Sequence, residues 1–468
     1  MGLAAAASRV LGGGRVLVVA AVLGTTFLGD AFEAANTLPT VVFELLAAGA
    51  LSAVLVPTFA RLFDHGDVDE AARRAGGLLG IVLVVLGTLA VIGILAAPLL
   101  ADLLVAEGTS SAAELEARRS LTTDLLRYFL PQLVLYPFGF LAIALLNARR
   151  VFALPAAAPI ANTVVVVSAL IAFRVVAGAD PGVELTAGET MLLGLGGTLG
   201  VAAFVAVPTI ALWRQGVSLR PRLSAVDGEV VGLLRLSSWA VLQHTGGALL
   251  LGAAIILGAA TEGGVIAYRV AFYLFLAPYG ILAQPIHTAV HPEVSAEARE
   301  GDLDAFARSV RWALDSLALV VIPASAAMIA LAQPTMQVLA FGAADSGDGV
   351  SLMAAGSASL GLGLFAYGGF RLMAAAWYAL DDSRTPAIVA VATAALGVAA
   401  MIAIAPHVDG AALVAVLGLG HTGAFLVGAV VLTVALARRI GRPLLPKLLG
   451  RTVLASTAIG SLLWVVVW

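Results

Sequence analysis

The chain has 468 residues, of which 61% are hydrophobic and only 12% are charged, and its mean hydropathy is +1.02. A soluble domain carries about 25% charged residues, so this composition excludes a water-soluble fold, and the abundance of aliphatic residues excludes a disordered chain. The net charge of −3 offers no basic surface for nucleic acid, and the absence of cysteine excludes disulfides and thiolate chemistry. The remaining class is the integral membrane proteins.

Apolar segments of membrane-spanning length recur along the chain. A spanning helix needs roughly 20 mostly apolar residues, and exposed backbone polar groups are too costly in hydrocarbon for an extended segment. The predicted fold class is therefore all-α, a polytopic membrane protein. Thirteen spanning segments are predicted, at 9–28, 37–60, 77–103, 121–147, 153–175, 190–213, 230–259, 264–290, 309–331, 350–380, 386–405, 410–436 and 449–468.

The basic residues are distributed unevenly between the predicted loops. If the N-terminus is cytoplasmic, the cytoplasmic side holds 19 of the 26 basic residues, whereas the clearly outside loops hold only Arg118 and Arg119. Short cytoplasmic loops carry an excess of arginine and lysine, so the sequence predicts a multi-pass protein of the bacterial plasma membrane with a cytoplasmic N-terminus. The 19 residues are Arg9, Arg15, Arg61, Arg73, Arg74, Arg149, Arg150, Arg214, Arg220, Arg222, Arg299, Arg308, Arg311, Arg384, Arg438, Arg439, Arg442, Lys447 and Arg451.

An internal repeat connects the two halves of the chain. A proline, a Gly-Asp-x-Asp turn and an arginine recur at a constant offset of 235 residues, and a tyrosine and a proline recur at an offset of 231. In both sets, the matching residues are separated by six predicted helices. Because six is an even number, the two halves would have the same orientation in the membrane. The pairs are Pro57, Gly66, Asp67, Asp69 and Arg73 with Pro292, Gly301, Asp302, Asp304 and Arg308, and Tyr136 and Pro155 with Tyr367 and Pro386.

This repeat predicts the domain organisation. We expect an N-terminal six-helix lobe at 1–215, a C-terminal six-helix lobe at 216–437, and a basic link with a thirteenth helix at 438–468. Repeats of this kind are typical of transporters, in which the substrate site lies between the halves near the middle of the membrane.

The first apolar segment carries the most informative charges. Arg9 and Arg15 flank three glycines near its predicted cytoplasmic end, and Asp30 and Glu33 follow near its outer end. Guanidinium groups bind phosphate oxygens in a bidentate manner. Six residues apart on an ideal helix, the two arginines would diverge by about 120°, but the glycines permit a bend that would bring them together. The alternative is that both arginines only anchor the segment in the membrane.

Later segments contain three patterns that could mark a functional site, and they lead to different predictions. Arg269 lies well inside its predicted span, where an ionisable group is costly and tends to face a polar cavity. The stretch 418–423 fits GxGxxG but lies in an apolar helix, so it predicts close helix packing and not a nucleotide site. His287 and His291 stand four residues apart without an evident third ligand, so neither a metal nor any other cofactor is expected.

Several motifs together resemble the MurJ/MviN family of lipid II flippases, in the multidrug/oligosaccharidyl-lipid/polysaccharide exporter superfamily. The resemblance implies a flippase that carries a lipid-linked pyrophosphate from the inner to the outer leaflet by alternating access through a cationic cavity. It covers nearly the whole chain. The motifs are Ser8–Gly12, Asp30–Phe32, Pro39, Gly49–Ser52 and Val56–Pro57, then Leu146–Asn147, Phe152, Pro155 and Ala158–Pro159, and finally Tyr378, Asp381 and Arg384–Pro386.

The sequence departs from the family at three places. An arginine expected in the second helix falls on Phe43, with Glu44 beside it, and an arginine expected in the eighth falls on Tyr273. Arg269, one helical turn earlier, is the predicted substitute for the latter. Family members have fourteen helices, whereas this chain ends at Trp468 in its thirteenth predicted helix.

The predicted function is a lipid II flippase whose substrate head group binds Arg9, Arg15 and Arg269. Asp30 and Glu33 would gate the outer side or pair with these arginines. The expected partners are the lipid-linked pyrophosphate, membrane lipids and cell-wall synthesis proteins. Three alternatives remain open, namely an exporter of another lipid-linked polysaccharide, a drug–cation antiporter, and a non-transporting scaffold of cell-wall assembly, which the missing arginines favour.

Overall fold

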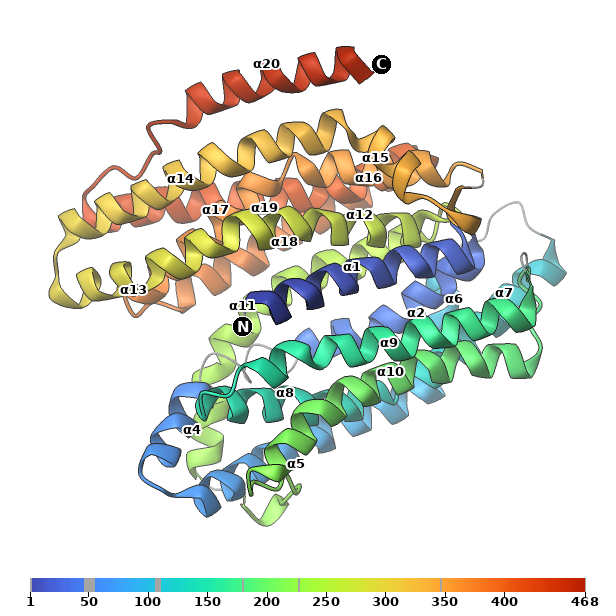
Figure 1. Ribbon diagram of the computed structural model, residues 1–468, viewed down its shortest axis with the longest axis horizontal. Coiled ribbons are helices and arrows are strands. Elements are labelled where there is room, and N and C mark those ends of the chain that lie inside the picture. The colour runs from blue at the N-terminus through green and yellow to red at the C-terminus, as the bar shows by residue number, and fades with distance from the viewer. Residues whose placement is uncertain are drawn as a thin grey trace. The chain divides into compact units, whose positions relative to one another are not determined.

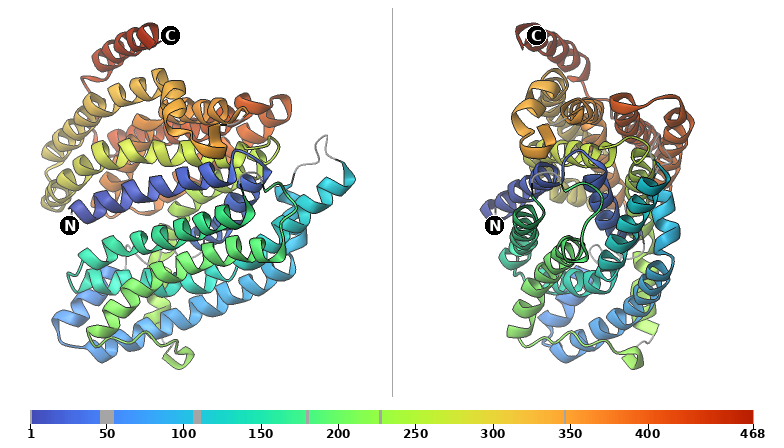
Figure 2. Two further views of the ribbon diagram at one scale, coloured as in Figure 1. Left: turned by 45° about the vertical axis from the view of Figure 1, so that its right-hand side comes forward. Right: turned by 90° about the vertical axis from the view of Figure 1, so that its right-hand side faces the viewer.

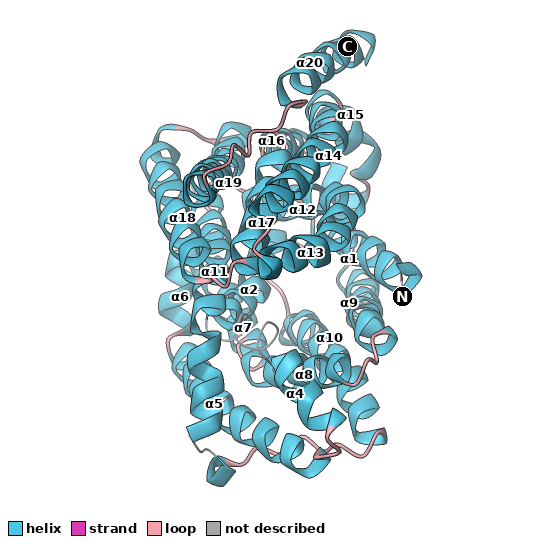
Figure 3. Cartoon of the chain, turned by 90° about the vertical axis from the view of Figure 1, so that its left-hand side faces the viewer, coloured by secondary structure: helices cyan, strands magenta, loops and turns pink. Residues whose placement is uncertain are grey.

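The described part of the chain is built from helices. The computed structural model describes residues 2–45, 55–105, 111–178, 181–225, 228–345 and 347–467, and none of these residues forms a strand (Figure 3). The prediction of an all-α fold is therefore confirmed.

The chain divides into two compact units, Met1–Ala248 (unit 1) and Leu249–Trp468 (unit 2). The boundary falls inside helix α11, whereas the sequence predicted it in the preceding loop, and the assignment of six helices to each lobe stays a prediction. The helices up to this boundary are α1 Gly2–Leu23, α2 Phe27–Phe43, α4 Leu55–Asp64, α5 Val68–Leu95, α6 Ala97–Leu104, α7 Ala112–Phe129, α8 Gln132–Ala148, α9 Ala153–Ala177, α10 Ala187–Arg214, the 3₁₀ turn η2 Leu223–Ala225 and α11 Gly228–Gly258 (Figure 1).

Unit 2 continues from α11 with a further set of long helices and short connecting turns. The segment between α12 and α13 is a π-helical turn, η3, which keeps the two α-helices in one nearly continuous rod. The elements are α12 Gly264–Pro278, η3 Tyr279–Ala283, α13 Gln284–Glu300, α14 Leu303–Ala330, α15 Ala332–Leu339, η4 Gly342–Asp345, α16 Gly349–Gly361, α17 Leu364–Ala379, α18 Arg384–Ile404, η5 Ala405–His407, α19 Gly410–Ile440 and α20 Leu449–Val467 (Figure 1).

Most of the predicted spanning segments coincide with helices of spanning length. Within the described residues, nine helices or joined helices are long and apolar enough to cross a membrane, and α16 with α17, bent by 44°, would form a tenth. The predicted segments 9–28 and 449–468 coincide with shorter apolar stretches, Leu11–Leu23 and Leu449–Val465. The predicted segment 37–60 is only partly described, because 46–54 lie outside the described residues.

Local structure recurs at the predicted offset of 235 residues. Gly66 and Gly301 have positive φ angles of 82° and 75°. The next residues, Asp67 and Asp302, each donate a backbone hydrogen bond to the carbonyl five residues back, at 2.9 and 3.1 Å. This bond closes a Schellman-type helix end, which favours glycine because it needs a left-handed residue.

A second helix end recurs at the offset of 231 residues. In the described part of the chain, the non-glycine residues with positive φ are Arg150 (60°) and Asp381 (57°), which are separated by this offset. In each case the following N–H bonds to the carbonyl five residues back, at 2.8 and 3.1 Å. Two matched pairs of turns are what a repeated supersecondary unit would produce.

Small residues permit close contacts between neighbouring helices. A Cβ atom added at Gly196 or Gly200 of α10 would collide with Ala169 or Val166 of α9. In unit 2 the GxGxxG stretch does the same, since a Cβ at Gly418 would collide with Ser359. The prediction that this stretch serves helix packing is therefore confirmed, and such packing by small residues is common in membrane helices.

The last helix, α20, lies along α14 within unit 2 (Figure 1, Figure 2). Its buried residues Thr452 and Ser456 are four residues apart, and a Cβ at Gly460 would lie 3.3 Å from Ala326 of α14. The helix begins where the Leu448 N–H donates to Asp315 Oδ1 at 2.8 Å. An anionic group at a helix N-terminus is electrostatically favourable, so Asp315 serves as an anchor for this helix.

Candidate functional site

Arg15 projects from α1 toward α9. Its Nη1 donates to Oδ1 of Asn162 at 3.1 Å, and both side chains are half-buried. Helix α1 continues without a break through Gly12–Gly14, and the bend that these glycines permit stays a prediction. The chain breaks instead at Gly24, which has a φ of 77°. The backbone of Arg9 lies in α1, but its side chain lies outside the described residues, so its predicted convergence with Arg15 stays a prediction.

Asp30 and Glu33 lie at the start of α2 and not at the end of the first helix. The break at Gly24 ends α1 earlier than predicted, and α2 begins at Phe27. Both carboxyl side chains are buried, with 5% and 2% of their surface exposed. Asp30 lies in the first turn of α2, where the positive end of the helix stabilises a carboxylate. Their predicted gating role stays a prediction.

A buried polar network joins three helices of unit 1. Gln132 of α8 is fully buried, and its Nε2 donates to Asn36 of α2 at 3.2 Å and to Thr198 of α10 at 3.3 Å. Its Oε1 accepts from the Tyr136 hydroxyl at 3.1 Å, and this hydroxyl lies 3.0 Å from Thr40 Oγ1. The amide therefore has bonds on both its donor and its acceptor side. Such a satisfied network fixes the register of α2, α8 and α10.

The position of the missing second-helix arginine is filled by an aromatic stack, defined as Phe43, Tyr136 and Phe140. The Phe43 ring is 1% exposed and lies 5.3 Å from the Tyr136 ring and 4.7 Å from the Phe140 ring. These separations are typical of favourable aromatic contacts. The loss of the arginine therefore coincides with a gain of packing in unit 1.

Arg269 of α12 is buried inside unit 2, with 8% of its surface exposed. Its Nη2 donates to the Tyr273 hydroxyl at 3.4 Å, and its guanidinium carbon lies 5.0 Å from the centre of that ring. Arg269 and the residue at the expected arginine position therefore form one cation–π pair. Arg15, Asp30 and Glu33 belong to unit 1, whereas Arg269 belongs to unit 2.

The next residue of α12, Tyr268, pairs with a histidine in the core of unit 2. Its hydroxyl lies 3.0 Å from Nδ1 and 3.1 Å from Nε2 of His421, and Nδ1 also lies 3.2 Å from the Leu417 carbonyl. A neutral imidazole that donates from Nδ1 to Leu417 and accepts at Nε2 from Tyr268 would satisfy both nitrogens. The pair therefore has the properties of a satisfied core contact.

A further cation, Arg371, was missed as a site residue in the sequence. It lies on α17 within hydrogen-bonding reach of the Tyr279 hydroxyl of η3, with Tyr367 and Tyr378 close by. The Tyr279 hydroxyl is also 3.2 Å from Nδ1 of His287, and the Tyr279 and Tyr367 rings lie 4.6 Å apart. We call Arg371, Tyr279, His287 and Tyr367 the Arg371 cluster. In the sequence, Arg371 is a single charge in an otherwise uncharged predicted span, which is one indication of a functional residue. Its partners on η3 and α13 could not be predicted, because they are far from it in the sequence.

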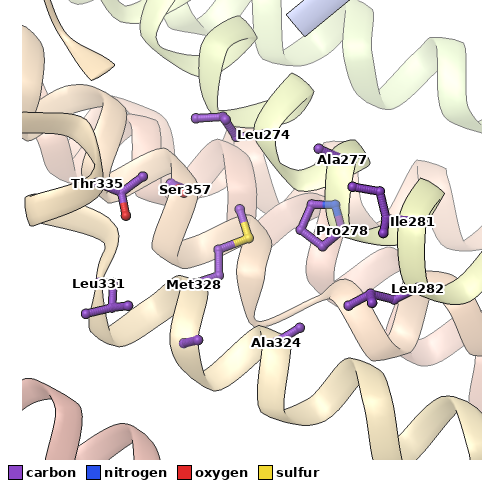
Figure 4. A pocket seen from close by; sticks show the side chains of 11 residues that line it. Leu274, Ala277, Pro278, Ile281, Leu282, Ala324, Met328, Leu331, Thr335 and Ser357 are labelled. Carbon is purple, nitrogen blue, oxygen red and sulfur yellow. The ribbon is translucent and has the colours of Figure 1, made fainter. Parts of the chain in front are cut away.

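An apolar pocket is lined in part by η3. It has a volume of about 500 Å³ and is lined by residues of α12, η3, α14, α15 and α16. Figure 4 shows Pro278 and Ile281 from one side and Met328 from α14 on the other. Only Thr335 and Ser357 bring hydroxyl groups to the lining. The chemistry of the pocket suits hydrocarbon and not a charged ligand.

The loop between α17 and α18 carries a second set of polar contacts. Asp382 accepts from the backbone and side chain of Thr385, both at 2.9 Å, and from Arg439 at 2.9 Å. Partial burial alone would raise the pKa of Asp382, but the hydrogen bonds from Thr385 and Arg439 outweigh it and hold that pKa below its usual value. These contacts fix the loop and have no evident role in binding.

No group of three or more potential metal ligands is found among the described residues. His287, which was considered as a metal ligand, contacts Tyr279 through Nδ1 and belongs to the Arg371 cluster. The cations described above on the apolar helices are Arg15, Arg269 and Arg371, and tyrosine hydroxyl groups lie close to the latter two. Guanidinium groups of this kind are suited to binding an anion.

Comparison with known proteins identifies the family. The family described as "Lipid II flippase MurJ" matches residues 19–468. A relative named "Probable lipid II flippase MurJ" from Rhizobium tropici is 28% identical over 81% of this chain and 69% of its own length. A relative named "Lipid II flippase MurJ" from Burkholderia cenocepacia is 25% identical over 82% of this chain and 73% of its own length.

Solved structures agree on the fold. A lipid II flippase MurJ in an inward closed conformation aligns with a TM-score of 0.76 and 16% identity, over 99% of this chain and 97% of the other. An inward-facing multidrug resistance transporter of the MATE family aligns with a TM-score of 0.73 and 14% identity, over 93% of this chain and 94% of the other. The family match extends over almost the entire sequence, and this chain therefore belongs to the lipid II flippase MurJ family, whose members are multi-pass proteins of the bacterial inner membrane.

Proposed function

We propose that this protein moves lipid II, a lipid-linked peptidoglycan precursor, from the inner to the outer leaflet of the bacterial plasma membrane. The observation that carries this proposal is the family match over residues 19–468. The relatives that align with most of this chain are named for the same substrate. The work of the protein is transport, and no catalytic role is proposed.

The placement of cations within the membrane helices supports an anionic substrate. Arg15 and Arg269 each hydrogen-bond to a neutral partner, Asn162 and Tyr273. Ionisable groups inside a membrane are costly and mark substrate pathways, and guanidinium groups match the geometry of phosphate oxygens. We therefore propose Arg15 and Arg269, with Arg9, as ligands of the pyrophosphate group.

The transport mechanism would be alternating access between the two units. The similarity of the fold to a MATE-family transporter supports this mechanism, and the buried acidic residues Asp30 and Glu33 are candidates for gating the outer side or pairing with the arginines. The lipid tail would remain in the bilayer while the head group passes. Cell-wall synthesis proteins are the partners we expect, because they supply and consume lipid II.

A cytoplasmic N-terminus is the proposed orientation, because it gives the strongest excess of basic residues on the cytoplasmic side. The turn that contains His65 and the end of α13 at Glu300 would then both be cytoplasmic. The chain has no cysteine, so His65→Cys and Glu300→Cys would each introduce a single exposed thiol. An impermeant thiol reagent should label neither position in intact cells and both after permeabilisation. Labelling of either variant in intact cells would overturn the orientation.

A second candidate function, a non-transporting scaffold, is favoured by one observation. The arginine expected in the second helix is replaced by Phe43 in a tightly packed aromatic stack. A complementation test separates the two functions. Cells depleted of their own lipid II flippase should grow when they express this chain. Failure to grow despite normal membrane insertion would contradict the flippase proposal and support the scaffold.

A further inference from the structure

Arg371 is the exposed residue of an otherwise enclosed helix. α17 packs against α13, α14, α18 and α19, and each of its other residues is buried or half-buried. Helices that face lipid expose large apolar side chains, as α18 does with Leu396 at 62% and Ile402 at 56%. α17 exposes no such side chain between Leu364 and Ala379. The exposure of Arg371 therefore points to a water-accessible surface and not to lipid.

The charge of Arg371 is not neutralised by a carboxylate in the part of the chain that the structure describes. Its described neighbours are the hydroxyl groups of Tyr279, Tyr367 and Tyr378 and the imidazole of His287. Other arginines behave differently, since Arg118 pairs with Glu114 at 2.6 Å and Arg439 pairs with Asp382 at 2.9 Å. An intramembrane cation that is held by neutral groups keeps its charge available for an anion from outside.

The neighbours of Arg371 form a relay that orients it. Arg371 lies within hydrogen-bonding reach of the Tyr279 hydroxyl, and this hydroxyl lies 3.2 Å from Nδ1 of His287, to which it can donate. Nε2 of His287 is buried, and the backbone of Gly368 lies close to the imidazole. Tyr279 is 7% exposed and is clamped by the Tyr367 ring at 4.6 Å. A contact with the Tyr279 hydroxyl would use only part of the guanidinium, which has five N–H groups and can therefore also bind an anion.

We propose that Arg371 is an anion-binding residue of unit 2 that contacts a phosphate group of the lipid-linked substrate, and that Tyr279 and His287 are its positioning residues. The proposal rests on the proposed function, which supplies the phosphate. The shared chemistry of the ligand is a phosphate or pyrophosphate group, whether it is attached to a lipid or free in solution.

Equilibrium binding to the full-length protein in lipid nanodiscs tests the proposal. The probes are a fluorescent polyprenyl pyrophosphate, followed by fluorescence anisotropy, and inorganic pyrophosphate as a competitor. Arg371→Lys keeps the charge but loses the planar guanidinium that can bind two phosphate oxygens at once. The lipid-linked probe should therefore bind about tenfold to a hundredfold more weakly, as expected for the loss of one charged hydrogen bond. Arg311→Lys is the matched control, because Arg311 donates to a carbonyl of its own helix and should bind like the parent.

A double-mutant cycle tests the positioning role of Tyr279. Tyr279→Phe removes only the hydroxyl that joins Arg371 to His287, and it should weaken binding about twofold to tenfold. The same change in an Arg371→Ala background should have no further effect, because the residue that it positions is gone. An equal loss in both backgrounds would show that the Tyr279 hydroxyl acts independently of Arg371, and this result would overturn the relay. Tyr279→Phe also keeps the test available if an Arg371 variant fails to fold.

The outcomes separate this inference from the proposed function. If the parent protein does not bind the lipid-linked probe, the proposed function itself fails. If the parent binds it and Arg371→Lys binds it equally well, the flippase proposal stands and the role of Arg371 is wrong. If Arg371→Lys weakens only the competition by inorganic pyrophosphate, the site binds a free anion, and its assignment to the substrate head group is overturned.

Discussion

The aromatic stack of unit 1 and the Arg371 cluster of unit 2 occupy matched places in the predicted repeat. Tyr136 and Tyr367 are 231 residues apart, and so are Phe140 and Arg371. In unit 1 the tyrosine lies beside the Phe43 and Phe140 rings at 5.3 and 6.4 Å. In unit 2 its counterpart lies beside Tyr279 and the guanidinium of Arg371.

On our proposal, equivalent positions of the two units serve two kinds of chemistry. The helices α8 and α17 end in matching turns at Arg150 and Asp381, which have the same backbone conformation. The side chains on the two helices differ, so that one copy serves packing while the other would serve binding. We therefore expect changes in the aromatic stack to alter stability and changes in the Arg371 cluster to alter binding.

The largest expected effect is on the aromatic stack. Phe43→Arg would restore the residue that the family resemblance leads one to expect, but the site is 1% exposed and filled by two neighbouring rings. Loss of a buried phenylalanine costs about 3–5 kcal/mol, and an unpaired buried charge adds to this cost. The variant should therefore show a markedly lower thermal unfolding midpoint in detergent than the parent. An unchanged midpoint would indicate that the stack opens to water and that the comparison is wrong.

The next effect concerns Arg15. If Arg15 binds phosphate, Arg15→Lys should lose the planar guanidinium that matches the phosphate oxygens. The variant should then bind a fluorescent lipid-linked pyrophosphate about tenfold to a hundredfold more weakly, and its transport of this probe should fall accordingly. If Arg15 only anchors α1, lysine keeps the charge, and Arg15→Lys should transport the probe almost as well as the parent. Asn162→Ala, which removes the partner at 3.1 Å, should cause a smaller loss. Parent-like transport by both Arg15→Lys and Arg15→Ala would exclude Arg15 as a substrate ligand.

The smallest effect is expected in the loop at Asp382, which lies outside both regions. The pKa of Asp382 is lowered in the folded protein, so the ionised carboxylate stabilises the fold above the unfolded-state pKa, and this contribution is lost as the pH falls through the folded-state pKa. Asp382→Asn should cost about 0.2–1 kcal/mol at neutral pH, because the pair with Arg439 is partly exposed. The difference from the parent in thermal midpoint should shrink as the pH falls below the unfolded-state pKa and through the folded-state pKa of Asp382. A difference that is independent of pH would contradict this origin.

The sequence predicted the helices well because spanning length and hydropathy are local properties. It misplaced Asp30 and Glu33, since the positive φ of Gly24 ends the first helix earlier than the apolar pattern does. The bend at Gly12–Gly14 stays a prediction, because α1 continues through these residues and glycine permits a bend without requiring one. The Arg371 cluster was missed because it is formed by α17, η3 and α13, and no local pattern indicates how these elements approach one another.

The central claim is that this member of the lipid II flippase MurJ family transports its substrate despite the loss of two expected arginines. The most direct test reconstitutes the parent protein in liposomes with a fluorescent lipid-linked pyrophosphate and measures the appearance of the head group on the opposite leaflet with a membrane-impermeant quencher. We predict transfer well above that of protein-free liposomes and a loss of transfer in Arg15→Ala. Transfer no faster than in protein-free liposomes, with the protein folded and inserted, would contradict the account and support the scaffold.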